Sequence, residues 1–181
     1  MESKIKVKDL TFEVMIPASD IDKAVAKVAD RINKDYADVK DPIFLGVLNG
    51  SFMFMSDLMK KIDIECELSF VKVSSYEGTA TTGSVKTLIG LNDSIEGRDV
   101  IIVEDIVDTG NSIEHLTELL AEQKPASVRI CTLFFKPKAY QKQIPIDYVA
   151  MEIGNEFILG YGLDYDQLGR NLKDIYVLCN E

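Results

Sequence analysis

The segment Asp99–Val103 constrains the fold most, because its unbroken apolar run is typical of a strand buried on both faces of a parallel sheet. A similar run covers residues 43–48, and further strands are predicted over 64–73 and 127–135. Apolar residues at helical spacing predict helices between them, over 53–61 and 112–123. Alternating strands and helices imply right-handed crossovers. We therefore expect an α/β fold with a mostly parallel sheet flanked by helices.

The two ends of the chain depart from this alternation. Short strands are predicted over residues 148–153, 157–159 and 175–179, without a clear helix between them. An amphipathic helix is predicted over residues 21–32, with Ser19 or Asp20 as its cap. We expect a single domain over residues 1–181, with a core of about residues 20–150. The short strands and the first residues are expected to form a small hood lobe from residues 1–15 and 151–181.

Composition excludes several kinds of partner. The chain has 20 Lys and Arg against 30 Asp and Glu, a net charge of −10, whereas nucleic acids and anionic membranes are bound by clustered basic residues. No apolar run approaches the roughly 18 residues of a membrane span, and residues 1–8 do not resemble a secretory signal, so we expect a cytoplasmic protein. The odd set Cys66, Cys131 and Cys179 has no C-x-x-C spacing and is expected to consist of buried, reduced thiols.

The densest group of candidate functional residues follows the central strand. Glu104 and Asp105 stand at its predicted carboxyl end, and Asp108-Thr-Gly-Asn-Ser112 leads into the next helix. Ligands of open α/β sheets bind at this edge. The loop N–H groups, the Thr109 and Ser112 hydroxyls and the helix N-terminus suit a phosphate. A simpler interpretation is that Asp108 only caps the helix.

Other interpretations explain less of the chain. Asp-Thr-Gly also occurs in aspartic proteases, but that fold is all-β and needs a second such motif, which is absent. A phospho-receiver module would account for residues 104–105 and Lys136-Pro137 but not for the first hundred residues. His115 has no Cys, Ser or His neighbour and is interpreted as structural. Residues 74–86, rich in Ser, Thr and Gly, are expected to be a mobile loop, either a long hairpin connection or a lid over a substrate.

Taken in order, these motifs resemble the purine phosphoribosyltransferases. The resemblance covers nearly the whole chain and rests on Val47-Leu-Asn-Gly-Ser-Phe52, Ser75-Tyr76, Val103-Glu-Asp-Ile-Val-Asp-Thr-Gly110, Lys136-Pro137, and Phe157 to Tyr165 with Arg170. It implies the type I phosphoribosyltransferase fold. It also implies a magnesium-dependent enzyme of purine salvage, which transfers phosphoribosyl from phosphoribosyl pyrophosphate to hypoxanthine, guanine or xanthine. A non-catalytic sensor of phosphoribosyl pyrophosphate is the alternative.

The resemblance further implies a role for each matching residue. Phosphoribosyl would be bound by Glu104, Asp105, Asp108, Thr109, Gly110, Asn111 and Ser112, and pyrophosphate by Leu48, Asn49, Gly50, Ser51 and Arg170. The purine would contact Lys136, Phe157, Ile158 and Asp164, under a lid that contains Ser75 and Tyr76. Asp108 would be the catalytic base, and Mg²⁺ would be held by Glu104 and Asp105, with a second ion at Asp164.

Three further expectations follow from the resemblance. The Leu48-Asn49 peptide bond is expected to be cis when pyrophosphate is bound. Asn49 and Asn111 stand where the family often carries a basic residue, which weakens side-chain contacts to phosphate without changing the backbone donors. A homodimer or homotetramer is expected.

Overall fold

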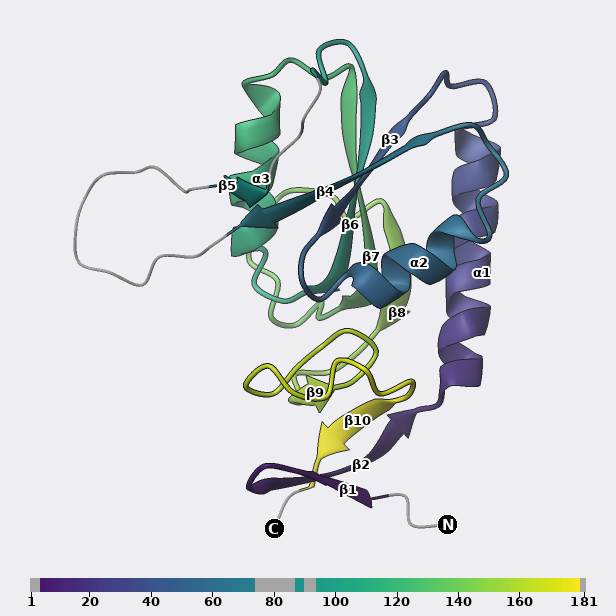
Figure 1. Ribbon diagram of the computed structural model, residues 1–181. Coiled ribbons are helices and arrows are strands. Elements are labelled where there is room, and N and C mark those ends of the chain that lie inside the picture. Colours follow the sequence, from purple (N-terminus) through teal and green to yellow (C-terminus); the bar gives the residue numbers. More distant parts are fainter. Residues whose placement is uncertain (1–3, 74–86, 90–93, 180–181) are drawn as a thin grey trace, which may run out of the picture.

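The computed structural model describes residues 4–73, 87–89 and 94–179, and its larger sheet has six strands (Figure 1). In spatial order they are β5 (Thr87–Ile89), β4 (Glu67–Val73), β3 (Ile43–Val47), β6 (Asp99–Val107), β7 (Ser127–Phe135) and β8 (Tyr148–Glu152). Only β5 runs antiparallel to its neighbour, and the other described pairings are parallel. The predicted α/β architecture is therefore confirmed.

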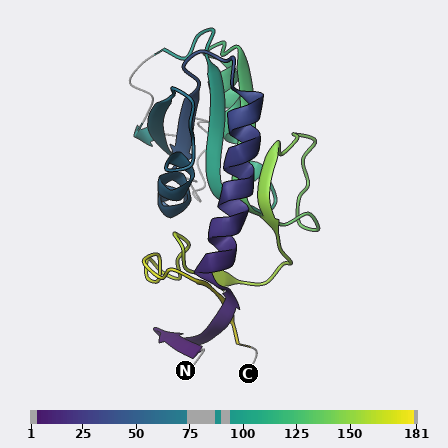
Figure 2. The same cartoon turned by 90° about the vertical axis from the view of Figure 1, so that its right-hand side faces the viewer.

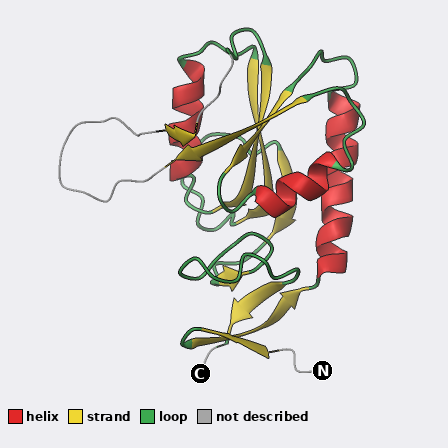
Figure 3. Ribbon diagram, in the orientation of Figure 1, coloured by secondary structure: helices red, strands yellow, loops and turns green. Residues whose placement is uncertain are grey.

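Helices cover both faces of this sheet (Figure 3). They are α1 (Ala18–Asp35), α2 (Phe52–Met59) and α3 (Asn111–Ala121). On β6, Ile101 and Val103 belong to the hydrophobic cluster that includes α1 and α2, while Val100 and Ile102 belong to the cluster that includes α3. Alternate residues of one strand thus enter two cores, which explains its unbroken apolar run.

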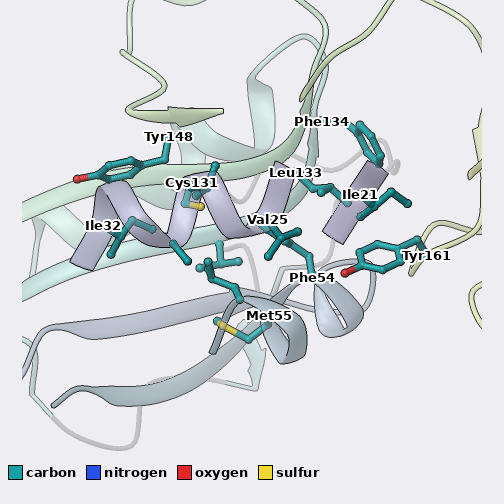
Figure 4. Close-up of a cluster of buried hydrophobic side chains, with 14 of the residues drawn as sticks. Ile21, Val25, Ile32, Phe54, Met55, Cys131, Leu133, Phe134, Tyr148 and Tyr161 are labelled. Carbon is teal, nitrogen blue, oxygen red and sulfur yellow. The ribbon is translucent and has the colours of Figure 1, made fainter. Parts of the chain in front are cut away.

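The buried face of α1 is the predicted one. It consists of Ile21, Ala24, Val25, Val28, Ala29 and Ile32, and part of it packs with Phe54 and Met55 of α2 and with Cys131 and Leu133 of β7 in the cluster that Figure 4 shows. The predicted cap is wrong, because Pro17 is the N-cap residue and no cap side chain bonds the helix. Instead the Asp174 carboxylate accepts a hydrogen bond of 2.7 Å from the Ala18 N–H.

We expect Asp174→Ala to lower the free energy of unfolding by about 1 kcal/mol, as the loss of a helix cap does. The exposed neighbour Lys173 provides a matched control, since Lys173→Ala removes a side chain without touching α1. Urea denaturation of both variants measures the difference. Equal midpoints for the two variants would contradict the capping role of Asp174.

A second sheet forms the small lobe at the end of the molecule that carries both termini (Figure 2). Its order is β1 (Lys4–Val7), β2 (Leu10–Ile16), β10 (Ile175–Leu178) and β9 (Ile158–Leu159), with every neighbour antiparallel. The first and last segments thus lie together as predicted. The assignment of residues 148–153 to this lobe is wrong, because β8 pairs in parallel with β7. The segment that connects β7 to β8 contains no described helix, so the sequence shows no helical pattern between these two parallel strands.

The lobe is attached to the core by side chains as well as by the chain itself. Tyr161 is buried in the cluster of Figure 4, and its hydroxyl donates a 2.6 Å hydrogen bond to the Asp57 carboxylate on α2. Burial and this hydrogen bond to Asp57 raise the pKa of Tyr161. The contact places residues after β9 beside the end of the parallel sheet.

The cysteines agree only partly with expectation. All three are free thiols, but only Cys131 is buried, and Cys66 and Cys179 are partly exposed because they lie at the periphery of the core and in the small lobe. Burial raises the pKa of the Cys131 thiol. Among the described residues no helix is long and apolar enough to cross a membrane.

Candidate active site

A cavity of about 520 Å³ opens at the carboxyl ends of β3 and β6. Residues from two strand-to-helix connections and from the C-terminal segment line it. They are Val47, Leu48, Asn49, Gly50, Glu104, Asp105, Ile106, Val107, Asp108, Thr109, Gly110, Asn111, Ser112, Ile113, His115 and Arg170. The structure thus brings together all the residues expected to bind phosphoribosyl and most of those expected to bind pyrophosphate.

Glu104 and Asp105 lie within β6 and not after its end. The strand continues to Val107, and Glu104 stays in register with Thr132 of β7. The predicted strand end was wrong because it was placed at the first charged residue, whereas Glu104 is 6% exposed. Burial and the neighbouring charge of Asp105 raise the pKa of Glu104 well above its usual range. Burial also raises the pKa of Asp105, against the hydrogen bond that it accepts from the Ile106 N–H.

The loop after β6 leaves a helix N-terminus free of side-chain caps. Gly110, with φ of +89°, is the N-cap residue of α3, and no side-chain hydrogen bond caps this helix. The simpler interpretation of Asp108 as a cap is therefore wrong. Its carboxylate lies 3.2 Å from the Nζ of Lys136 instead. The first N–H groups of α3 are left to a ligand, and a helix N-terminus favours an anion.

The turn after β3 contains the expected cis peptide bond between Leu48 and Asn49. Two of its four residues use their N–H groups within the protein, since Leu48 donates to the Val71 carbonyl at 2.8 Å and Ser51 to the Val47 carbonyl at 3.3 Å. The Ser51 hydroxyl bonds the same Val47 carbonyl. We expected four N–H groups for an anion, those of Leu48, Asn49, Gly50 and Ser51. The N–H groups of Leu48 and Ser51 are used within the protein, so Asn49 and Gly50 remain as the candidate donors.

Three segments of the chain meet closely at Gly50. A Cβ atom on Gly50 would lie 1.6 Å from Oδ2 of Asp105, so a larger residue requires either this turn or the Asp105 side chain to move. A Cβ atom on Gly162, which has a φ of +101°, would lie 2.0 Å from the Gly50 carbonyl oxygen. Arg170 donates to the Gly162 carbonyl at 2.8 Å and forms a 2.6 Å ion pair with Asp164. The C-terminal segment therefore supplies both the packing behind this turn and a cation to the cavity.

The four expected purine-binding residues do not line the cavity directly. Lys136 and Asp164 reach it through their ion pairs with Asp108 and Arg170. Ile158 is buried in β9, whereas Phe157 is 45% exposed and its ring centroid lies 6.0 Å from that of Tyr165. Two of the four expected residues are thus one ion pair away from the cavity, and the other two lie in or next to β9 of the small lobe.

The expected lid residues, Ser75 and Tyr76, lie outside the described residues.

His115 lines the cavity, although the sequence predicts a structural histidine at this position. Its Nε2 is buried with no hydrogen-bond partner in the described part of the chain. Its position four residues after Asn111 on α3 could have indicated this, because residues at that spacing share one face of a helix.

The cavity joins two adjacent carboxylates to an uncapped helix N-terminus at the carboxyl ends of parallel strands. The family model described as phosphoribosyl transferase domain matches residues 17–166, so the chain is a phosphoribosyltransferase by family. The hypoxanthine-guanine phosphoribosyltransferase of Streptococcus pyogenes serotype M3 is 44% identical over 93% of this chain and 94% of its own. The hypoxanthine phosphoribosyltransferase of Escherichia coli K12 is 42% identical over 91% of this chain and 94% of its own. A crystal structure of that enzyme from Staphylococcus aureus matches with a TM-score of 0.85 and 43% identity, over 92% of this chain and 91% of its own. The chain belongs to the hypoxanthine-guanine phosphoribosyltransferase family.

Proposed function

We propose that this chain transfers phosphoribosyl from phosphoribosyl pyrophosphate to a 6-oxopurine, hypoxanthine or guanine, in purine salvage. The products are the nucleoside 5′-monophosphate and pyrophosphate. The observation that carries the proposal is the single cavity in which the carboxylates of β6, the loop before α3, the Asn49-Gly50 turn and Arg170 meet. This composition suits a ligand with a phosphate at each end and a sugar between them.

In this proposal the 5′-phosphate binds at the loop of residues 108–112. The uncapped N–H groups of α3 and the hydroxyls of Thr109 and Ser112 are its donors. Because Asn111 carries no charge, the backbone supplies most of this contact. Glu104 and Asp105, on the adjacent strand, would accept hydrogen bonds from the ribose hydroxyls.

Pyrophosphate would bind on the opposite side of the cavity. Its donors are the N–H groups of Asn49 and Gly50, with Arg170 as the cation. Leu48 and Ser51 would support this turn through their bonds to Val71 and to the β3 carbonyl. The leaving group is thus held by residues that come from β3 and from the C-terminal segment.

Mg²⁺ fits this donor set. Glu104 and Asp105 are adjacent carboxylates on the cavity wall, and burial together with the like charge disfavours their ionisation unless a cation is near. Mg²⁺ takes one or two carboxylates and completes its shell with water and substrate phosphates, so a cluster of three protein ligands is not required. When bound, the ion would neutralise negative charge on the pyrophosphate. Asp164 would serve a second ion beside Arg170.

The purine would bind between the cavity and the small lobe. Lys136, 8% exposed, would donate to O6 of the base, and the exposed ring of Phe157 would stack on it. The Ile158 backbone would contact the exocyclic edge, and Asp108 would take the N7 proton. Assembly into a homodimer or homotetramer, which the family resemblance implies, is part of this proposal.

We expect nucleotide formation from hypoxanthine or guanine but not from adenine, because the Lys136 ammonium donates to an oxo group and opposes an amino group. An ultraviolet assay with each base, phosphoribosyl pyrophosphate and Mg²⁺ measures this. Omission of Mg²⁺, or its removal by a chelator, should abolish turnover. Adenine turnover comparable to that of hypoxanthine would refute the proposed specificity.

A further inference from the structure

The segment of residues 136–142, which follows β7, contacts successive residues of the loop 108–112, where we propose that the 5′-phosphate binds. Lys136 forms the 3.2 Å ion pair with Asp108. The Gln141 N–H then donates to the Thr109 carbonyl at 3.2 Å. The two segments therefore lie side by side, with Lys136 beside Asp108 and Gln141 beside Thr109.

The same segment encloses Gly110. A Cβ atom there would lie 2.5 Å from Cε2 of Tyr140 and 2.8 Å from Cγ of Lys142. Tyr140 is itself held in place, since its hydroxyl donates to the Ile144 carbonyl at 2.6 Å and its ring packs edge-on against Phe135 at 5.3 Å. The aliphatic part of Lys142 thus lies beside Tyr140 against Gly110, the N-cap residue of α3.

The charged end of Lys142 reaches Glu114 in the first turn of α3. Its Nζ lies 2.6 Å from Oε2 of Glu114, and the side chains are 20% and 42% exposed. A carboxylate in the first turn stabilises a helix but repels an anion bound at the same N-terminus. Helix stability and phosphate binding thus make opposite demands on Glu114.

We propose that Lys142 is a positioning residue for the 5′-phosphate, which cancels the charge of Glu114 and holds it to one side of the N-terminus of α3. This inference rests on the proposed function, because that function places a phosphate at this helix. Lys142 is not among the residues that line the cavity, so it would act through Glu114. Asn111 brings no positive charge to the loop, so the charge of Glu114 is balanced locally by Lys142.

Binding of ribose 5-phosphate, measured by calorimetry without the other substrate, tests the proposal directly. Lys142→Met should raise its Kd about fivefold, and more at low ionic strength. In the transferase assay the KM for phosphoribosyl pyrophosphate should rise similarly, with kcat within about twofold. Lys142→Arg should keep wild-type binding. Lys138→Met removes a charge from an exposed position of the same segment and should change nothing.

The double variant Glu114→Gln, Lys142→Met separates charge from packing. Restored ribose 5-phosphate binding supports the proposal, whereas binding as weak as in Lys142→Met would overturn it and assign the effect to the contact with Gly110. An unchanged Kd in Lys142→Met also overturns it, as does a wild-type chain that does not bind ribose 5-phosphate. A wild-type chain that binds ribose 5-phosphate but forms no nucleotide would contradict the proposed function alone.

Discussion

Replacing Gly50 by valine should abolish transferase activity, with a loss in kcat/KM of at least about 10²-fold. The reason is the position of Asp105, whose Oδ2 would lie 1.6 Å from the new Cβ atom. The Gly50 backbone has little room to shift, because an added Cβ atom on Gly162 would lie only 2.0 Å from the Gly50 carbonyl oxygen. Either the Asn49-Gly50 turn or the Asp105 carboxylate must move, and the proposed function needs both.

The adjacent Asn49→Ala is the matched control. We propose that this turn binds pyrophosphate through its backbone, so loss of the Asn49 side chain should change pyrophosphate inhibition by no more than about threefold. Thermal melting of both variants distinguishes a damaged site from an unfolded chain, and Gly50→Ala provides a smaller perturbation if valine prevents folding. Near-normal kcat/KM in Gly50→Ala would contradict this account.

The parts of the fold that were predictable are those in which burial leaves a regular pattern. The bounds of β7 match the prediction, and the buried face of α1 is the predicted set, because the apolar residues of both elements recur with the spacing of the face that packs on a core. The prediction that residues 148–153 belong to the small lobe is wrong because β8 pairs in parallel with β7. No described helix lies between these two strands, so the sequence carries no helical pattern that marks the crossover. The cap of α1 failed because Asp174 lies far away in the sequence.

Predictions for the candidate site succeeded where neighbouring residues act together. The loop of residues 108–112 and the carboxylates before it lie in one cavity because a single strand-to-helix connection carries them. Arg170 reaches the same cavity, but only its resemblance to a family motif pointed to it. Which N–H groups of the turn after β3 remain for a ligand could not be predicted, because Leu48 is bound by the neighbouring strand β4 through Val71.

The Asp108→Asn variant should lower kcat by about 10²–10⁴-fold while the binding of both substrates stays similar. Asparagine has nearly the same shape, and its carbonyl oxygen can still accept the hydrogen bond that Lys136 now donates to Asp108. It cannot accept a proton from the purine. Asp108 is also about half exposed at the cavity, so the loss of its charge should affect the folded state little.

Single-turnover and steady-state kinetics of Asp108→Asn separate binding from chemistry. Glu118→Gln, at an exposed position of α3, removes one negative charge from the same region and should leave kcat unchanged. A normal kcat in Asp108→Asn would contradict the role as a base. Capping of α3 would not be the remaining role of Asp108, because Gly110 is the N-cap residue and no side chain bonds this helix N-terminus. Asp108 would instead serve to orient Lys136, and Lys136→Met should then reproduce whatever effect on purine affinity Asp108→Ala shows.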